Sequence, residues 1–271
     1  MDLGINGKRA LVTGSSSGLG RQIALELAAE GVDVVVNGRD ADRTEKTARD
    51  IEALGARAAI AIADLCTDEG ADHAAAVAND RFGGVDILVN NTGVLLRKDN
   101  PAWDEVGIDE WIASFNVNFL AGLRMVHRLL PGMKQRGWGR IINVSSTSGS
   151  QPKGLSPEYG APKASVDNFT VNLSKLVGPF GITVNSIVPG TIMTPAVEVW
   201  LETLKAQRGW GDDMDENEQR YVSEFVKQSI PRLGRPREIS TAVAMLASPL
   251  QGYTNGATLR IDGGMAIHIG A

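Results

Sequence analysis

Short apolar runs alternate with longer segments of helical periodicity along this chain. The runs are rich in β-branched residues and lie at 9–13, 32–37, 57–63, 85–90, 139–146, 181–188 and 257–262. Two stretches, 32–36 and 85–89, are apolar at nearly every position instead of alternating, which is typical of parallel strands covered by helices on both faces. The pattern therefore predicts an α/β fold with a doubly wound, parallel sheet.

The chain shows no internal repeat, low-complexity tract or flexible linker that would divide it. We therefore predict a single domain over residues 1–271. The one irregular region, about 194–231, is helical in pattern and rich in charge, and we interpret it as an insertion between a strand and a helix. Insertions of this kind in doubly wound folds lie over the carboxyl ends of the strands, where ligands bind.

Composition narrows the range of partners. A hydrophobic content of 43% supports a large core, and a net charge of −5 disfavours nucleic-acid binding, which needs a basic face. No apolar run approaches the ~20 residues of a membrane span, and residues 1–14 lack the pattern of a secretory signal, so we expect a cytoplasmic protein with no membrane partner. Cys66, the single cysteine, is expected to be a small packed residue, and the scattered His73, His127 and His268 predict no metal site.

A glycine-rich segment, TGSSSGLG at 13–20, follows the first predicted strand and precedes an amphipathic helix. Gly14 allows a sharp turn, Gly18 lets the backbone approach a pyrophosphate, and Gly20 lets the helix pack against the strand. The free amides at the helix start then face the negative charge. This position after the first strand favours a dinucleotide site, although the same glycines could form a tight turn with nothing bound.

The end of the second predicted strand bears on which dinucleotide binds. An acidic residue there would bond the adenosine ribose and repel a 2′-phosphate, whereas this chain has Asn37, Gly38 and Arg39. Arg39 can clamp the phosphate, which predicts NADP as the preferred cofactor. NAD stays possible, because Arg39 could instead be an exposed loop residue whose charge is partly cancelled by Asp40.

A candidate acid–base pair lies in the segment YGAPK. Residues 156–177 have helical periodicity, so Tyr159 and Lys163 lie one turn apart on one face. Lys163 is expected to lower the pKa of Tyr159 toward the working pH, because a nearby ammonium stabilises a phenolate. The pair could also arise by chance on a solvated helix face. Ser146, at the end of the predicted strand 139–146, favours a functional pair, since its hydroxyl could hold a substrate oxygen against the phenol.

Further motifs extend this set along the chain. They are TGSSSGLG (13–20), Ala63–Asp64, NNTG (90–93), Asn118 within FNVNFLAG, Ser146, YGAPK (159–163), PGTIMT (189–194) and IDGG (261–264). With them, the chain from Gly7 to Gly264 resembles the short-chain dehydrogenase/reductase family, in particular 3-oxoacyl-carrier-protein reductases and sugar dehydrogenases. The resemblance implies a Rossmann-type sheet of seven strands and an NAD(P)-dependent oxidoreductase. Thr92 departs from the family pattern, which usually has alanine there.

The resemblance also implies a role for each matching residue. Tyr159 would give a proton to a carbonyl in reduction or take one in oxidation, and Ser146 would orient and polarise the substrate oxygen. Lys163 would hold the nicotinamide ribose hydroxyls, and Asn118 would position a water that links Lys163 to solvent. The full set of expected cofactor contacts is Gly14, Ser16, Ser17, Gly18, Leu19, Gly20, Arg39, Asp64, Leu65, Asn91, Gly93, Tyr159, Lys163, Pro189, Gly190, Ile192 and Thr194.

The predicted reaction interconverts a small-molecule carbonyl and a secondary alcohol by hydride transfer. The region 194–231 would then be an enlarged substrate lid. Pocket residues are expected to include Val94, Leu95, Leu96, Ser148 and Gln151, while Trp200, Leu201, Leu204, Trp210, Tyr221 and Phe225 could face substrate or simply pack two helices together. The alternatives are an NAD-linked sugar, polyol or steroid alcohol dehydrogenase and a non-catalytic dinucleotide-binding sensor. The family resemblance further implies a homodimer or homotetramer with the apolar tail 265–271 between subunits.

Overall fold

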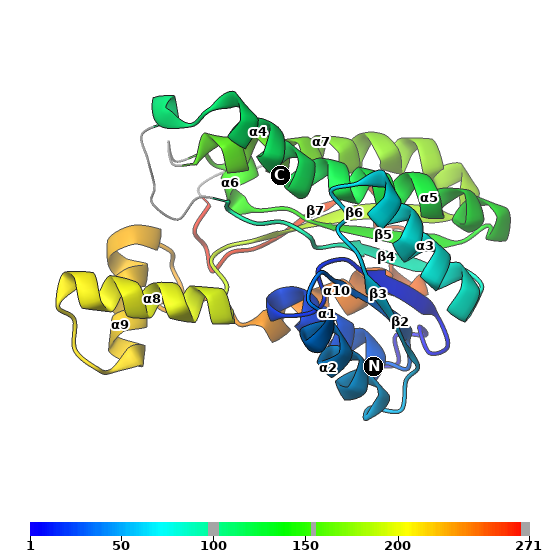
Figure 1. Ribbon diagram of the computed structural model, residues 1–271, viewed down its shortest axis with the longest axis horizontal. Coiled ribbons are helices and arrows are strands. Elements are labelled where there is room, and N and C mark those ends of the chain that lie inside the picture. The colour runs from blue at the N-terminus through cyan, green and yellow to red at the C-terminus, as the bar shows by residue number, and fades with distance from the viewer. Residues whose placement is uncertain (97–102, 153–155, 267–271) are drawn as a thin grey trace.

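The strands form one sheet that is parallel throughout. The computed structural model describes residues 1–96, 103–152 and 156–266. The strands are β1 (Arg9–Val12), β2 (Asp33–Gly38), β3 (Ala58–Ile62), β4 (Ile87–Asn90), β5 (Gly139–Val144), β6 (Ile182–Pro189) and β7 (Thr258–Ile261). They make a seven-stranded sheet in the order β3-β2-β1-β4-β5-β6-β7, with every pairing parallel (Figure 1). The fold class predicted from the sequence is confirmed.

Helices cover both faces of this sheet (Figure 1). They are α1 (Gly18–Ala29), α2 (Ala41–Glu52), α3 (Asp68–Phe82), α4 (Ile108–Phe115), α5 (Ala121–Arg136), α6 (Thr147–Ser150), α7 (Pro157–Val177), α8 (Pro195–Arg208), α9 (Met214–Tyr221) and α10 (Pro236–Ala247), with short turns η1 (Trp103–Glu105), η2 (Asn116–Leu120), η3 (Gly178–Phe180), η4 (Val222–Val226) and η5 (Pro249–Gln251). Helices α1, α2 and α10 pack on one face, and α3, α5 and α7 pack on the other. None of the helices among the described residues is long and apolar enough to cross a membrane.

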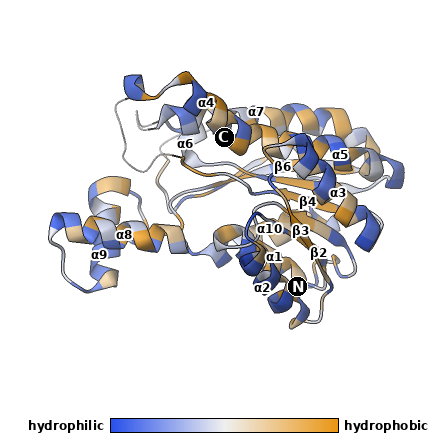
Figure 2. Cartoon of the chain, viewed as in Figure 1, coloured by the Kyte–Doolittle hydropathy of each residue, from blue (hydrophilic) through white to orange (hydrophobic). Residues whose placement is uncertain are grey.

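Alternation along the strands builds two hydrophobic cores, one on each face. In β1, Ala10 and Val12 point into the core shared with α1 and α10, whereas Leu11 points into the core shared with α3 and α5. All three side chains are fully buried. Strands whose two faces are both covered must be apolar at successive positions, which explains the continuous hydrophobic colour of the central strands (Figure 2).

The order of the strands places a crevice at one edge of the sheet. From β1 the chain proceeds outward to β2 and β3, then returns to pair β4 with the opposite side of β1. The connections that leave the carboxyl ends of β1 and β4 therefore diverge to opposite faces. Ligands in open parallel sheets bind at such a switch point.

Helix α7 begins with an unusual backbone conformation. Ser156, which precedes it, has φ of 48°, in the left-handed region that residues other than glycine seldom adopt. Pro157 follows at the first helical position, where a missing amide costs no hydrogen bond. The observed helix agrees with the helical segment predicted at 156–177, and its first turn carries Tyr159.

The region 194–231 forms a helical excursion to one side of the sheet (Figure 1). It contains α8, α9 and η4, and it has a small core of its own, made of Leu201, Val222, Val226, Leu233 and Met265. Its two stems are joined, because Met193 N donates to Gly234 O at 2.8 Å and Gly234 N donates to Thr191 O at 3.0 Å. The sequence-based predictions for His268 and for the tail from residue 267 onward lie outside the described residues.

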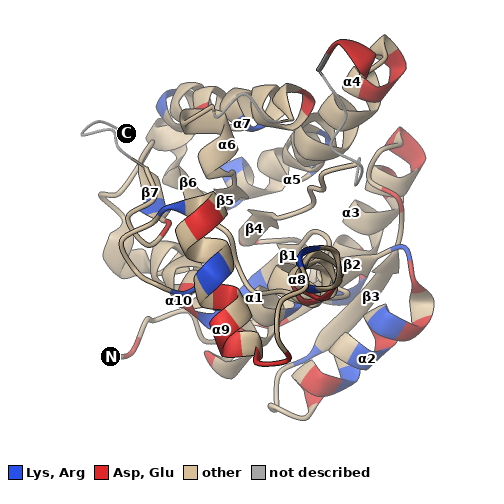
Figure 3. Ribbon diagram, turned by 90° about the vertical axis from the view of Figure 1, so that its left-hand side faces the viewer, with Lys and Arg blue, Asp and Glu red and all other residues tan. Residues whose placement is uncertain are grey.

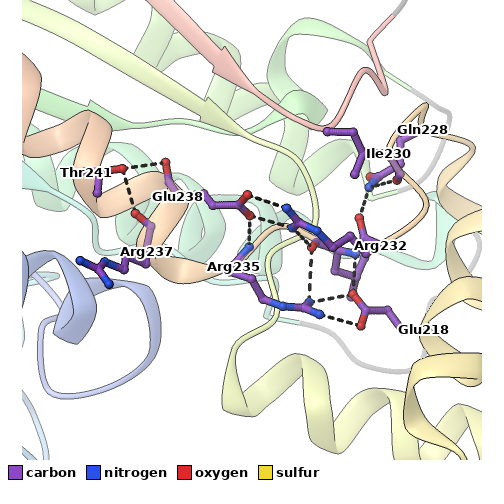
Figure 4. A network of polar contacts seen from close by, with 9 residues as sticks. Glu218, Gln228, Ile230, Arg232, Arg235, Arg237, Glu238 and Thr241 are labelled. Carbon is purple, nitrogen blue, oxygen red and sulfur yellow. Dashed lines mark hydrogen bonds and ion pairs between the residues drawn. The ribbon is translucent and has the colours of Figure 1, made fainter.

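A network of ion pairs anchors α9 to the start of α10 (Figure 4). Glu218 is only 4% exposed, and its carboxylate accepts from Arg235 at 2.7 and 2.9 Å and from Leu233 N at 2.6 Å. Beside it, Arg232 binds Glu238 at 2.7 and 2.9 Å and holds the pKa of that carboxyl down to about 2. Charges of both signs gather on α9 (Figure 3), but Glu218 is the one that points into the protein.

Replacing Glu218 by alanine is expected to loosen the excursion. The change leaves Leu233 N without its acceptor and Arg235 without its carboxylate. The free energy needed to open the excursion locally should therefore fall by roughly 2–3 kcal/mol. Hydrogen exchange of the α9 amides measures this directly. Glu216→Ala is the matched control, because Glu216 is exposed and pairs only with Arg220 one turn away, so a change below about 0.5 kcal/mol is expected. Equal losses in the two variants would contradict the anchoring role.

Candidate active site

A large crevice lies at the carboxyl ends of β1, β4, β5 and β6. It has a volume of about 740 Å³, with the glycine-rich turn on one side and the YGAPK segment on the other. Of the residues predicted from the sequence, those that line it are Gly14, Ser17, Gly18, Leu19, Gly20, Asn91, Gly93, Ser146, Tyr159, Lys163, Pro189, Gly190, Ile192 and Thr194. Those that do not line it are Ser16, Arg39, Asp64, Leu65 and Asn118. Most of the predicted set therefore meets in one place.

The glycine-rich turn has the shape that a pyrophosphate requires. Gly14 and Gly18 have φ of +63° and +55°, which favour glycine. A Cβ on Gly20 would lie 2.3 Å from Gly14 O and 2.5 Å from Asn91 Nδ2, so no side chain fits there. The first turn of α1 consequently opens onto the crevice with free amides, and these residues fit a dinucleotide phosphate.

The segment after β4 is fastened to the end of β1. The hydroxyl oxygen of Thr13 accepts from the amides of Asn91 and Thr92, both at 2.9 Å. The side-chain amide of Asn91 donates back to Thr13 O at 3.0 Å. Asn91 thus shapes the floor of the crevice through bonds within the protein. Its side-chain NH₂ group is thus already bonded to the backbone of Thr13 and Gly14.

Lys163 is buried at the base of the crevice, with 3% exposure. Its ammonium donates to Val144 O, at the end of β5, at 2.9 Å. Burial lowers the pKa of Lys163 to about 8, while the charge of Asp167 opposes this by favouring the ammonium. The segment after β4 passes close to this ammonium at Gly93. A Cβ there would lie 2.7 Å from Lys163 Nζ and 2.9 Å from Asn118 Oδ1. The glycine at position 93 is therefore a steric requirement.

Tyr159 lies one turn before Lys163, with Lys163 Nζ 5.8 Å from the centre of its ring. Burial raises the pKa of Tyr159, and a hydrogen bond with the Ser146 side chain opposes the rise. The sequence-based expectation of a lowered pKa is therefore wrong for the protein alone. Two partly desolvated groups face each other here, and the loss of hydration of the phenolate outweighs any help from the ammonium.

Ser146 is held with its hydroxyl oriented. It is the N-terminal capping residue of the short helix α6, because its Oγ accepts from Ser148 N at 3.2 Å. The hydroxyl hydrogen is left to point at a neighbouring oxygen, such as that of Tyr159 or of a bound carbonyl compound. Ser146 and Tyr159 therefore converge in the crevice from two different elements, the start of α6 and the first turn of α7.

Asn118 sits in the π-helical turn η2 with 4% exposure, and its side chain is fully used by protein groups. Its Oδ1 accepts from Val94 N at 2.9 Å, and its Nδ2 donates to Val94 O and Ser114 O, both at 3.0 Å. The side chain thus holds the segment that contains Gly93 in place beside Lys163. The water-positioning role expected for Asn118 stays a prediction.

Two arginines follow the end of β2, one just before α2 and one in its first turn. Arg39, the residue singled out from the sequence, has a side chain that is 77% exposed and lies 3.9 Å from a carboxylate oxygen of Asp64. Arg43, in the first turn of α2, lines the crevice and pairs with Asp40 at 3.0 Å. Arg43 was not among the residues predicted from the sequence. It lies four residues after Arg39 and three after Asp40, the N-terminal capping residue of α2, and a second arginine so close to the end of the strand could have indicated it.

The residues expected around the substrate have mixed environments. Val94, Leu95 and Leu96 are between 44% and 45% exposed, and the buried Oε1 of Gln151 has no hydrogen-bond partner. In the excursion, the predicted apolar set divides. Leu201 and Leu204 pack inside. Trp200 meets Tyr221 edge to face and Phe225 stacks on Tyr221, and both stay partly exposed.

Cys66 lies partly buried after β3. Burial raises the pKa of its thiol to about 11, with a further contribution from Asp64. The thiol therefore stays protonated at neutral pH, as expected for a packed residue and not for a nucleophile.

Comparison with known proteins accounts for this arrangement. A family model described as short chain dehydrogenase matches residues 8–205. An uncharacterized oxidoreductase, YvaG of Bacillus subtilis, is 37% identical over 269 residues, which is 98% of each chain. The 3-oxoacyl-[acyl-carrier-protein] reductase FabG of Pseudomonas aeruginosa is 35% identical over 265 residues, 97% of this chain and 99% of the relative.

A solved structure extends the likeness to the whole fold. L-sorbose reductase from Gluconobacter frateurii, complexed with NADPH and L-sorbose, superposes with a TM-score of 0.93 at 34% identity and covers 99% of this chain and 100% of its own. The matches span nearly the full length of both partners. The chain therefore belongs to the short-chain dehydrogenase family and is an NAD(P)-dependent oxidoreductase.

Proposed function

We propose that the protein reduces a carbonyl compound to a secondary alcohol, with Tyr159 as the acid and NADP(H) as the preferred cofactor. The observation that carries the proposal is the convergence of Tyr159, Ser146 and Lys163 at one end of a crevice whose other end is the glycine-rich turn. The reverse oxidation uses the same groups with Tyr159 as the base. The bound nicotinamide would supply or accept the hydride at its C4 carbon.

The residues of the chain handle the proton and the oxygen. Ser146 donates its free hydroxyl hydrogen to the substrate oxygen and so stabilises the charge that develops there. Tyr159 gives up its proton to the same oxygen. Because burial keeps the pKa of Tyr159 raised, the phenol is protonated at neutral pH and is ready for the reductive direction. Lys163, held by Val144 O, offers its remaining ammonium hydrogens to the ribose hydroxyls.

The preference for NADP rests on the adenosine end. At the close of β2, Asn37 is buried with its side chain bonded within the protein, so no carboxylate opposes a 2′-phosphate at that position. Arg39 and Arg43 supply two guanidinium groups on the same side, although Asp40 and Asp64 partly neutralise them. The likeness to an NADPH-complexed reductase supports the same preference. NAD remains the second cofactor to test.

A sugar or polyol substrate is the second candidate within this reaction class. It is favoured by the likeness to L-sorbose reductase. A panel of ketoses and 3-oxo esters assayed with NADPH distinguishes this candidate from an acyl substrate.

Tyr159→Phe is expected to lower kcat by about 10²–10⁴-fold, the usual contribution of a general acid, while the Kd for NADPH changes little. Steady-state assays with the best substrate of the panel and calorimetric titration of NADPH measure the two effects. Tyr253→Phe is the control, because Tyr253 is fully exposed and should tolerate the change. Normal turnover in Tyr159→Phe would refute the assigned role.

Arg39→Ala and Arg43→Ala are each expected to weaken NADPH binding by about 10-fold or more, because each removes a charge-assisted bond to the phosphate. Binding of NADH should stay within about twofold, since it has no 2′-phosphate. Arg49→Ala, on the exposed side of the same helix α2 and paired with Glu45, serves as the control. Parallel losses for NADPH and NADH would argue against a phosphate contact.

Asp167 is placed to set the charge of Lys163. It lies one turn beyond Lys163 on α7, and its Oδ2 accepts from the Ser145 hydroxyl at 2.9 Å. The same hydroxyl lies 3.1 Å from the main-chain oxygen of Lys163. The negative charge of Asp167 raises the pKa of Lys163, against the lowering effect of burial. Asp167 therefore acts as a positioning residue that favours the ammonium.

Replacing Asp167 by asparagine should lower the pKa of Lys163 below its value of about 8. If the ammonium is the active form, the fall of kcat/KM at high pH then begins at a lower pH than in the wild type, because kcat/KM reports the free enzyme. The measurement is the pH profile of kcat/KM. Asp109→Asn, on the exposed side of α4, should leave the profile in place. An unmoved high-pH limb in Asp167→Asn would count against this role.

A further inference from the structure

A small cavity lies beneath the segment that follows β4. Its volume is about 20 Å³, and it sits between the ends of β1, β4 and β5 and the helices α5 and α7. Its polar lining comes from Thr13, Asn90, Thr92, Asn118 and Asn143. One water molecule needs roughly 10–15 Å³, so the space suits one and not two.

Two of the polar atoms in this lining have no hydrogen-bond partner among the residues that the structure describes. They are Asn90 Oδ1 and Thr92 Oγ1, both fully buried as atoms. The orientation of the Asn90 amide is fixed by a chain of donors: Asn90 Nδ2 donates to Asn143 Oδ1 at 2.9 Å, and Asn143 Nδ2 donates to Thr170 Oγ1 at 2.8 Å. Thr170 in turn donates to Val166 O at 2.8 Å. Turning the Asn90 amide over would set two acceptors against each other, so Oδ1 is an acceptor without a donor.

A hydroxyl hydrogen is also available in the same lining. The oxygen of Thr13 already accepts from two backbone amides, those of Asn91 and Thr92. A hydroxyl has two lone pairs and one hydrogen, so this oxygen is full as an acceptor and keeps its hydrogen to donate. The cavity thus presents one donor, one acceptor and the hydroxyl of Thr92, which can be either.

We propose that this cavity is the binding site of one ordered water molecule, which accepts from Thr13 and donates to Asn90 Oδ1 and Thr92 Oγ1. Three bonds are typical for a buried water, and each would satisfy a group that otherwise bears the full cost of desolvation. An apolar cavity of the same size would stay dry. The polar lining is what distinguishes this one.

The water ties together the two strand ends that support the cofactor crevice. Thr13 follows directly after β1 and leads into the glycine-rich turn, while Asn90 ends β4 and Thr92 lies two residues further on. Thr92 lies directly against that turn, because a Cβ on Gly14 would be 3.1 Å from Thr92 Oγ1. The bound water is therefore expected to hold the floor beneath the turn in the shape that the dinucleotide needs.

A crystal structure of the full chain, at a resolution that shows ordered waters, tests the site directly. A single density peak within hydrogen-bonding distance of the Thr13, Asn90 and Thr92 atoms is expected. Absence of density in the cavity would overturn the proposal. This readout needs no substrate and no turnover, so it stands or falls separately from the proposed reaction.

Two variants at position 92 test the role of the water. Thr92→Val keeps the shape but removes the hydroxyl, and it should lose the water and raise the Kd for NADPH by about 3–10-fold, equivalent to one hydrogen bond. Thr92→Ser keeps the hydroxyl, and it should retain both the density and the wild-type Kd. If Thr92→Val keeps the wild-type Kd for NADPH, the water does not support the cofactor crevice. If Thr92→Ser loses the water, the proposed bond between the water and the hydroxyl at position 92 is wrong.

Discussion

The arrangement of the site depends on the buried ammonium of Lys163. Its bond to Val144 O fastens the first part of α7 to the end of β5, and its own main-chain oxygen lies within reach of the Ser145 hydroxyl. Because Ser146 follows directly, the strand end and the helix are locked in register. Tyr159, one turn earlier on the helix, is brought against Ser146 as a result. The segment after β4 can pass beside the ammonium only as glycine, at Gly93.

Burial acts on the two ionisable partners in opposite ways. It raises the pKa of Tyr159 and lowers that of Lys163, because in each case it disfavours the charged form. The protein alone therefore holds a neutral acid beside an amine whose charge is only moderately favoured. Asp167 and the Val144 carbonyl both act to keep that amine protonated. An acid kept neutral until a substrate oxygen arrives suits proton donation better than proton abstraction.

The crevice and the excursion are held by separate sets of contacts. Thr13, Asn91 and Asn118 bind the segment after β4 from both sides, and the chain from Asn90 through Asn143 to Thr170 reaches across to α7. The excursion has a separate small core, two joined stems and the Glu218 network. Because the base of the crevice and the excursion are stabilised by different contacts, the two parts can move independently.

The sequence by itself determined the parallel sheet, the glycine-rich turn and the spacing of Tyr159 and Lys163. These are local or periodic features. Gly20 belongs with them, because no side chain fits at its position and the sequence records that requirement directly as a glycine. Tertiary structure alone decided that Arg43 and not Arg39 lines the crevice, that the Asn118 side chain is committed to Val94, and that the pKa of Tyr159 is raised. Each of these depends on which distant groups surround a side chain and how much water they exclude, and neither quantity is encoded in spacing along the chain.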